Sequence, residues 1–264
     1  MNAGRTARER VRAELTREIT DIARRQLATE GASGLSLRAV AREMGMVSSA
    51  IYRYFPSRDD LLTALIIDGY NAIGAAVEKA EAGCARDDHA GRWLAACRAV
   101  RAWALANPHE YALVYGSPVP GYRAPEQTIG PASRAAAVLG RIIGDAYRAG
   151  PGSCGPGSGG PGSGGPGSTV PGPVRPGVAA VGSPAPGAWP AVPGSFGPDA
   201  DRLRAAVLAG VPDHVAAGAL VAWSGLFGVV SFELFGQFEN VVTDRDPFFD
   251  HAAAMLGCLA GLPA

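Results

Sequence analysis

The residues best suited to chemistry lie close together, in the stretch LSLRAVAREMGMVSSAIYRYFPSRDDLL from Leu35 to Leu62. It combines small hydroxyl side chains with phenols and guanidinium groups. Proteins use such donors to hold phosphates and to approach the edges of base pairs. The candidate contacts to duplex DNA in this stretch are Arg38, Ser48, Ser49, Ala50, Tyr52, Tyr54 and Arg58.

The same stretch predicts two short helices joined by a tight turn. The first helix is expected over residues 37–44, with the Ser36 hydroxyl as its N-cap. Gly45 falls where the turn needs a left-handed backbone, which costs glycine least. Ala41 is small where a second helix must cross closely, and that helix is expected to begin at Ser48.

In such a motif the second helix enters the major groove. Ser48, Ser49 and Ala50 begin that helix and are small enough for close approach to bases. The two tyrosines and Arg38 and Arg58 are placed to reach phosphates on either side. For any one of these residues, core packing or a solvated surface is the simpler explanation, and Phe55 and part of Tyr54 are expected in the core. Their joint occurrence in one unit favours DNA binding.

The charge distribution points the same way. The chain of 264 residues carries 24 basic and 24 acidic side chains. Residues 1–58 hold eleven arginines and six carboxylates, whereas residues 59–264 hold thirteen basic and eighteen acidic residues. A basic amino-terminal part on an acidic body is typical of a nucleic-acid-binding head.

Hydrophobic periodicity predicts an all-α chain. We expect a flexible Arg-rich arm over residues 1–14, a helix-turn-helix domain over 15–62 and a helical body over 63–264. The expected helices outside the motif are 15–27 (ending at Gly31), 57–81 (capped by Ser57), 89–107, a short helix through Tyr115, 126–150, 212–236 and 247–262. Residues 150–198, with sixteen Gly and twelve Pro, are expected to be a disordered linker or surface loop. The arm is expected to be disordered; the alternative is an arm that reaches into a minor groove.

Residues 15–62 resemble the amino-terminal domain of TetR-type transcriptional regulators. The residues that carry the resemblance are Gly31, Ser36, Val40, Ala41, Gly45, Ser48, Ile51, Tyr52, Tyr54, Phe55, Ser57, Arg58 and Leu61. Met46 and Val47 depart from the pattern, which often has valine followed by a polar residue. The resemblance adds Ser36 to the DNA-contacting set, and it implies a DNA-reading head on a helical body that binds a ligand and dimerises.

The body also resembles, less specifically, a TetR carboxy-terminal type with a Trp-His-Gly signature. The stretch AWSGLFGVVSFELFG keeps Trp223, Gly228 and Glu233, but Phe227 stands where histidine is common. This resemblance implies no particular effector.

The run from Val215 to Phe232 contains no charged residue, which is near the lower length limit of a membrane span. It lacks basic flanks, so we expect a buried helix at a homodimer interface and no membrane partner. Small residues would allow close approach of the second helix: Gly218, Ala222, Gly225 and Gly228.

An effector pocket is expected among the helices between Tyr70 and Tyr147, although ordinary packing also explains most of the aromatic residues there. The candidate lining residues are Trp93, Trp103, Asn107, His109, Tyr111, Tyr115 and Tyr122, with Glu110 as a further polar group. The four histidines stand singly, and the four cysteines have no metal or redox spacing. The sequence therefore predicts no catalysis, no metal and no cofactor. It predicts that the thiols are reduced.

These features together predict a cytoplasmic homodimeric repressor that a small, largely apolar molecule releases from a palindromic operator. The alternative is a helical small-molecule sensor or carrier whose head binds a protein.

Overall fold

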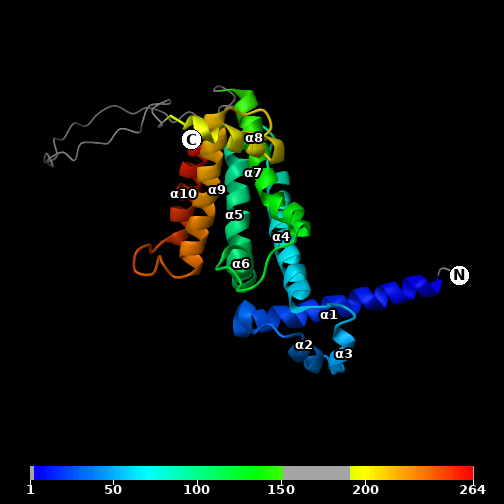
Figure 1. Cartoon of the computed structure of the whole chain (residues 1–264). Coiled ribbons are helices and arrows are strands. Elements are labelled where there is room, and N and C mark those ends of the chain that lie inside the picture. The colour runs from blue at the N-terminus through cyan, green and yellow to red at the C-terminus, as the bar shows by residue number, and fades with distance from the viewer. Residues whose placement is uncertain (1–2, 151–190, 264) are drawn as a thin grey trace, which may run out of the picture.

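The computed structural model describes residues 3–150 and 191–263, and every regular element in these ranges is helical, which confirms the all-α prediction. A small head lies at one end of a long helical body (Figure 1). The head contains α1 (Ala3–Gly34), α2 (Leu37–Glu43), α3 (Ser48–Ile51) and the start of α4 (Arg58–Ala82). The body adds α5 (His89–Ala106), α6 (Pro108–Tyr115), η1 (Glu126–Thr128), α7 (Ile129–Ala149), η2 (Gly194–Phe196), α8 (Gly197–Ala206), α9 (Asp213–Leu234) and α10 (Arg245–Leu259).

The head has its own hydrophobic core. Ile19 and Ile22 of α1 are buried against Val40 of α2 and Ile51 of α3. The first turns of α4 complete this core, whereas Ile73 and Val77 farther along α4 belong to the core of the body. One continuous helix therefore connects the two cores, and a change in its tilt would move the head.

The predicted flexible arm is wrong for residues 3–14, which continue α1 as a helix (Figure 1). The stretch RTARERVRAEL contains good helix formers and no proline, so nothing in it ends a helix. The predicted end of the first helix at Gly31 is confirmed, because φ is 69° at that residue and helical backbone is interrupted there.

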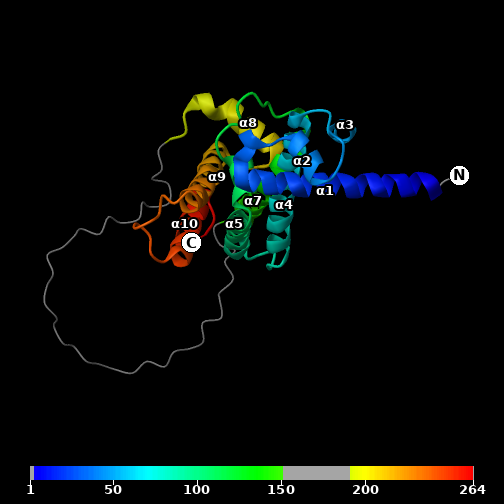
Figure 2. The ribbon, with the colours of Figure 1, turned by 90° about the horizontal axis from the view of Figure 1, so that it is seen from below.

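The body is a bundle in which α4 packs against α5 and α7, and α9 packs against α10. The α9–α10 pair and α4 lie on opposite sides of α5 and α7 (Figures 1 and 2). The indole N–H of Trp93 in α5 donates a hydrogen bond of 2.8 Å to the Ala253 carbonyl of α10. This bond joins α5 to the α9–α10 pair.

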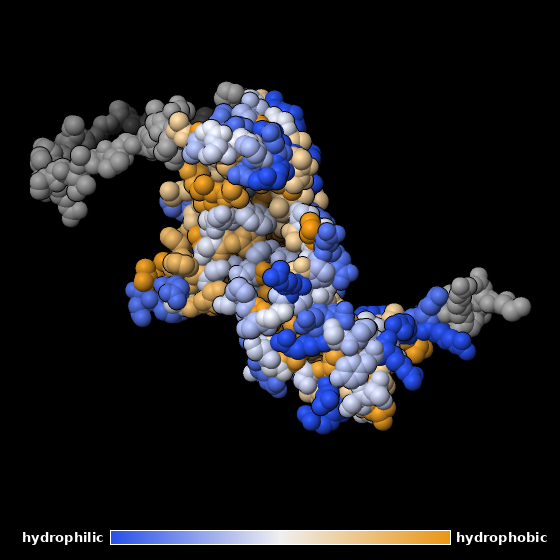
Figure 3. Space-filling view, in the orientation of Figure 1, coloured by the Kyte–Doolittle hydropathy of each residue, from blue (hydrophilic) through white to orange (hydrophobic). Residues whose placement is uncertain are grey.

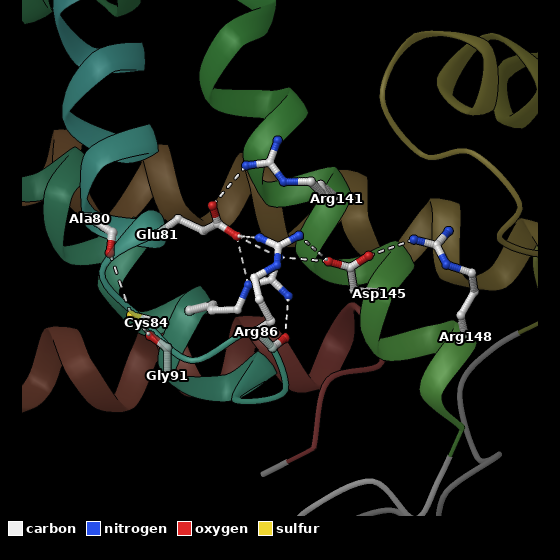
Figure 4. A network of polar contacts seen from close by, with 9 residues as sticks. Ala80, Glu81, Cys84, Arg86, Gly91, Arg141, Asp145 and Arg148 are labelled. Carbon is white, nitrogen blue, oxygen red and sulfur yellow. Dashed lines mark hydrogen bonds and ion pairs between the residues drawn. The ribbon is translucent and has the colours of Figure 1, made fainter.

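A buried ion-pair network holds α4, α5 and α7 together (Figure 4). The fully buried Arg92 guanidinium contacts Glu81 Oε1 at 2.6 Å and Asp145 Oδ2 at 2.8 Å. Arg141 binds the second oxygen of Glu81 at 3.0 Å, and Arg86 and Arg148 complete the network. Burial alone would raise the pKa of Glu81 and of Asp145. Hydrogen bonds from Arg92 and Arg141 to Glu81, and from Arg92 and Arg148 to Asp145, outweigh this effect, so both pKa values lie below normal.

The predicted linker over 150–198 is wrong at its carboxyl end. Residues 194–196 form η2, and α8 begins at Gly197 with Pro198 in its first turn, where the missing N–H costs nothing. Phe196 packs against the body core, so this end has an apolar anchor. Residues 151–190, where the rest of the predicted linker falls, lie outside the described residues.

Three of the four small residues predicted at a dimer interface have another role. A Cβ on Gly218 would lie 2.0 Å from the Leu259 carbonyl oxygen, and one on Gly225 would lie 2.5 Å from Leu256 Cδ2. Ala222 is fully buried within the chain. The two glycines allow α9 to pack closely on α10 of the same chain, whereas Gly228 has open space where its Cβ would be.

By length and composition alone, α4 and α9 are apolar enough to cross a membrane. In the structure both helices pack against other helices of the bundle. A helix that packs in a bundle is apolar on its packed side, so the packing accounts for part of their composition; 50% of the apolar window of α4 and 39% of that of α9 are buried.

Candidate functional site

The turn between α2 and α3 has the geometry that the sequence predicts. Gly45 has φ of 67°, in the left-handed region that glycine adopts most easily. The next residue, Met46, donates its N–H to the Ala41 carbonyl at 2.9 Å, and this bond closes the turn. The second helix begins at Ser48 as predicted, but α3 is only one turn long, and residues 52–54 continue as turns.

The start of α3 is exposed, as required of a segment that reads bases. Ser48 and Ser49 are exposed, Ala50 is half-buried, and Ile51 anchors the turn in the core. The Tyr52 ring is 41% exposed beside them. Among the apolar side chains here, Val47 stands out at 72% exposure, and it is suited to contact a thymine methyl group.

Two of the predicted DNA-contacting residues also hold the head together. Ser36 Oγ accepts a hydrogen bond from the Ala39 N–H at 3.4 Å and caps α2. Arg58 donates from Nη2 to the Ala32 carbonyl at 2.6 Å and from Nε to the Leu35 carbonyl at 3.3 Å. The Arg58 guanidinium thus links the start of α4 to the segment between α1 and α2. Arg38 is exposed on α2.

A residue absent from the predicted set, Arg12 of α1, lies beside α3. Its guanidinium carbon is 5.4 Å from the centre of the Tyr54 ring, and its Nη2 donates to the Arg53 carbonyl at 3.0 Å. Tyr54 is half-buried against the head core, as expected. The run of helix-forming residues from Arg5 to Leu15, without proline or glycine, was the sequence signal that could have extended the helix to Arg12.

The residues predicted to line one effector pocket do not line a single cavity, although Tyr111 and Tyr115 contact each other. Trp93 is buried between α5 and α10, and His109 is exposed. Asn107 donates to the Trp103 carbonyl at 2.8 Å, and so serves the junction of α5 and α6. Tyr111 is fully buried and its hydroxyl contacts Ser231 at 2.9 Å. Glu110 instead pairs with Arg24 at 3.4 Å.

Tyr115 lies in an aromatic cluster with Tyr70, Tyr111 and Phe227. Its ring centre is 4.2 Å from that of Phe227. The buried Tyr115 hydroxyl has no hydrogen-bond partner among the described residues. Burial, together with the neighbouring phenols, raises the pKa of Tyr115, so it stays a neutral phenol at physiological pH.

Two separate cavities flank α7. One lies between α5, α7, α8 and α9 and has a volume of about 140 Å³; Trp93, Ala136 and Trp223 contribute to its almost wholly apolar wall. The other is a groove of about 590 Å³ between α4, α6, α7 and the loop of residues 116–125. Tyr122 is the one predicted pocket residue that lines this groove.

Comparison with known proteins agrees with this architecture. Residues 19–65 match the family described as "Bacterial regulatory proteins, tetR family", and residues 93–256 match "Tetracyclin repressor-like, C-terminal domain". The chain is 36% identical over 256 residues to the HTH-type transcriptional regulator Rv1816 of Mycobacterium tuberculosis, covering 96% of this chain and 93% of that protein. The same values hold for the HTH-type transcriptional regulator Mb1846 of Mycobacterium bovis.

Solved structures show the same fold. The regulatory protein SCO4313 is 34% identical with a TM-score of 0.68, and the match covers 94% of this chain and 97% of that one. A protein of unknown function from Rhodococcus sp. RHA1 shares the fold with a TM-score of 0.61 at 23% identity, over 95% of this chain and 96% of that one. The chain therefore belongs to the TetR family of DNA-binding, helix-turn-helix transcriptional regulators.

Proposed function

We propose that this regulator is a homodimeric repressor that binds a two-fold symmetric operator and is released from it by a small, largely apolar molecule. The observation that carries the DNA-binding part is the exposed start of α3. Ser48, Ser49 and Tyr52 are exposed there, and a glycine turn and the buried Ile51 fix their position. Small residues presented in this way suit the major groove, where bases differ in their donors and acceptors.

Different residues have different roles in this proposal. Ser48, Ser49 and Ala50 face the bases, while Tyr52 and Arg38 hold phosphates, as do Ser36 and Tyr54 at the margins of the contact. Arg58, whose guanidinium already donates to two backbone carbonyls, mainly positions the head and adds positive charge near the DNA. Arg12 is exposed beside Tyr54 and is proposed as a further phosphate contact.

The dimer is proposed to form through the outward faces of α9 and α10. Exposed apolar side chains gather there, visible as the hydrophobic area over these helices, whereas the head surface is mostly hydrophilic in the same view (Figure 3). A two-fold dimer places two α3 segments on successive major grooves of one duplex face. The apolar residues proposed for the interface are Leu220, Val221, Phe232, Phe235, Phe248 and Met255, together with Gly228.

A mobility-shift titration with the DNA upstream of the protein's own gene tests this function. The wild-type chain is expected to bind a segment of that DNA with strong salt dependence, and Arg38→Ala to weaken binding to all sequences alike. Arg202→Ala, an exposed arginine of α8, is the matched control and should leave the affinity unchanged. Equal affinity of Arg38→Ala and wild type would favour a head that binds a protein.

A further inference from the structure

We propose that the groove between α4, α6, α7 and residues 116–125 is the effector site, and that it takes an uncharged, mainly apolar molecule bearing a hydrogen-bond donor such as a hydroxyl. This inference rests on the proposed ligand-released repressor and names the site and the ligand class. The groove volume of about 590 Å³ lies in the range of small-molecule sites. The smaller cavity, between α5, α7, α8 and α9, has a volume of about 140 Å³ and holds only a benzene-sized group.

The groove lining excludes a charged ligand. Apolar side chains such as Ile66, Val114 and Ala132 form most of its wall, and no lining residue is ionisable except the two phenols of Tyr70 and Tyr122. An ionised ligand would lose part of its hydration here without gaining a countercharge, and that loss is costly. An apolar molecule gains free energy by covering the same wall.

Three hydroxyl groups of the groove, those of Tyr70, Thr128 and Ser133, are arranged as acceptors. Tyr70 donates its proton to the Val114 carbonyl at 3.3 Å, and Ser133 donates to the Gly130 carbonyl at 2.8 Å. Thr128 similarly donates to the Pro125 carbonyl at 2.8 Å. Because these protons are engaged within the chain, the oxygens keep lone pairs for a ligand. A hydroxyl on the ligand complements them.

The groove is also hydrogen-bonded to the head. The Tyr122 hydroxyl lies 2.9 Å from Oγ1 of Thr63, which is buried on α4 beside the head core. Val119 and Tyr122 pack against that core as well, so residues 116–125 form both a wall of the groove and a support of the head. The loop that leaves α6 passes close to α4 just above α1 (Figure 1).

This arrangement couples ligand binding to DNA binding. A ligand that occupies the groove contacts the Tyr122 ring and competes for its hydroxyl, which breaks the bond to Thr63. The first turns of α4, and the head that is built on them, then lose a constraint on their position relative to residues 116–125. The ligand shifts the equilibrium only by the difference between its affinities for the linked and unlinked states.

Calorimetric titration of the full chain without DNA tests the site. The three probes are 1-decanol, its methyl ether, which lacks the donor, and decanoate, which is charged. We expect 1-decanol to bind about tenfold more tightly than either of the others, as loss of one hydrogen bond or an uncompensated charge requires. Ala132→Phe, which places a ring in the wall of the groove and narrows it, should weaken 1-decanol binding about tenfold or more. Ala136→Phe, one turn along α7 in the wall of the smaller cavity, should preserve it.

Absence of 1-decanol binding to the wild type, equal binding of decanoate, or loss in Ala136→Phe with retention in Ala132→Phe would each overturn the proposal. A second measurement tests the coupling. Tyr122→Phe should bind operator DNA about fivefold more weakly than the wild type and no longer respond to 1-decanol, although it still binds the alcohol. A wild-type decanol response in Tyr122→Phe would refute the link. Failure of the wild type to bind DNA would contradict the proposed function. The calorimetry uses no DNA, so it would still test whether the groove binds the ligand.

Discussion

Arg58 Nη2 lies 2.6 Å from the Ala32 carbonyl oxygen, so the first residue of α4 is tied to the end of the first helix of the head. A second bond from Arg58 Nε reaches the Leu35 carbonyl. The arginine closes the head at the point where α2 begins. The orientation of its guanidinium is therefore fixed by contacts within the chain.

Replacing Arg58 with alanine is expected to destabilise the head by roughly 1–2 kcal/mol, because two charge-assisted hydrogen bonds to carbonyls are lost at a half-exposed site. DNA affinity should fall together with stability. Urea denaturation followed by circular dichroism measures the first effect. Arg38→Ala, which removes an exposed arginine of α2, should leave stability unchanged; equal loss in both variants would contradict the positioning role.

Gly45→Ala is expected to destabilise the protein by about 1 kcal/mol or more, because the residue needs φ of 67° although nothing lies within 4 Å of its would-be Cβ. Gly130→Ala in the first turn of α7 also has open space but an ordinary φ, so it should be neutral or slightly stabilising. Thermal unfolding of the two variants gives the comparison. Similar effects in both would mean that the turn tolerates a side chain.

The network around Arg92 predicts a pH-dependent stability. The folded pKa values of Glu81 and Asp145 are below normal, so their contribution is present above the unfolded values, near pH 4, and is lost as pH falls through the folded values. Glu81→Gln should therefore cost about 3 kcal/mol at pH 7, since it leaves the buried Arg92 without a full partner, and much less at pH 3.

Asp250→Asn, which removes the more exposed ion pair with Arg98, is the control for this prediction. Its cost at pH 7 should stay below about 1 kcal/mol. Denaturation of the three proteins at several pH values measures these differences. A cost for Glu81→Gln that does not change between pH 7 and pH 3 would contradict the assigned protonation states.

The dimer proposal predicts that a charge on the outward face of α9 gives a monomer. Val221→Glu places a carboxylate on a side chain that is 55% exposed in the single chain, and burying it in an interface without a partner is costly. Val11→Glu changes an equally exposed valine of α1 and should leave the dimer intact. Sedimentation velocity distinguishes them; a dimeric Val221→Glu would place the interface elsewhere.

Local features of this fold could be predicted from the sequence because their causes are local. The cap at Ser57 accepts the Asp60 N–H at 3.1 Å as the spacing predicts, and Gly45 has the predicted left-handed backbone. The start of α3 also follows from this pattern. In these cases, residues within one turn of each other determine the conformation.

Features that depend on distant partners could not be predicted in the same way. Small residues on α9 indicate close helix packing, but the sequence does not say whether the partner is α10 of the same chain, as it is for Gly218, or a second subunit. Aromatic residues at helical spacing likewise do not reveal which cavity they face. Tyr122 and Trp93 line different cavities because α7 lies between them.

Selection from a random duplex library with the full wild-type chain tests the central claim, DNA reading by α3, most directly. The expected product is an inverted repeat whose half-sites are centred about one helical turn apart, or a multiple of it. Ser49→Ala should select a repeat changed at one position in each half-site, because Ser49 is exposed at the start of α3. Enrichment of no common sequence by the wild type, or of an identical repeat by Ser49→Ala, would contradict this account.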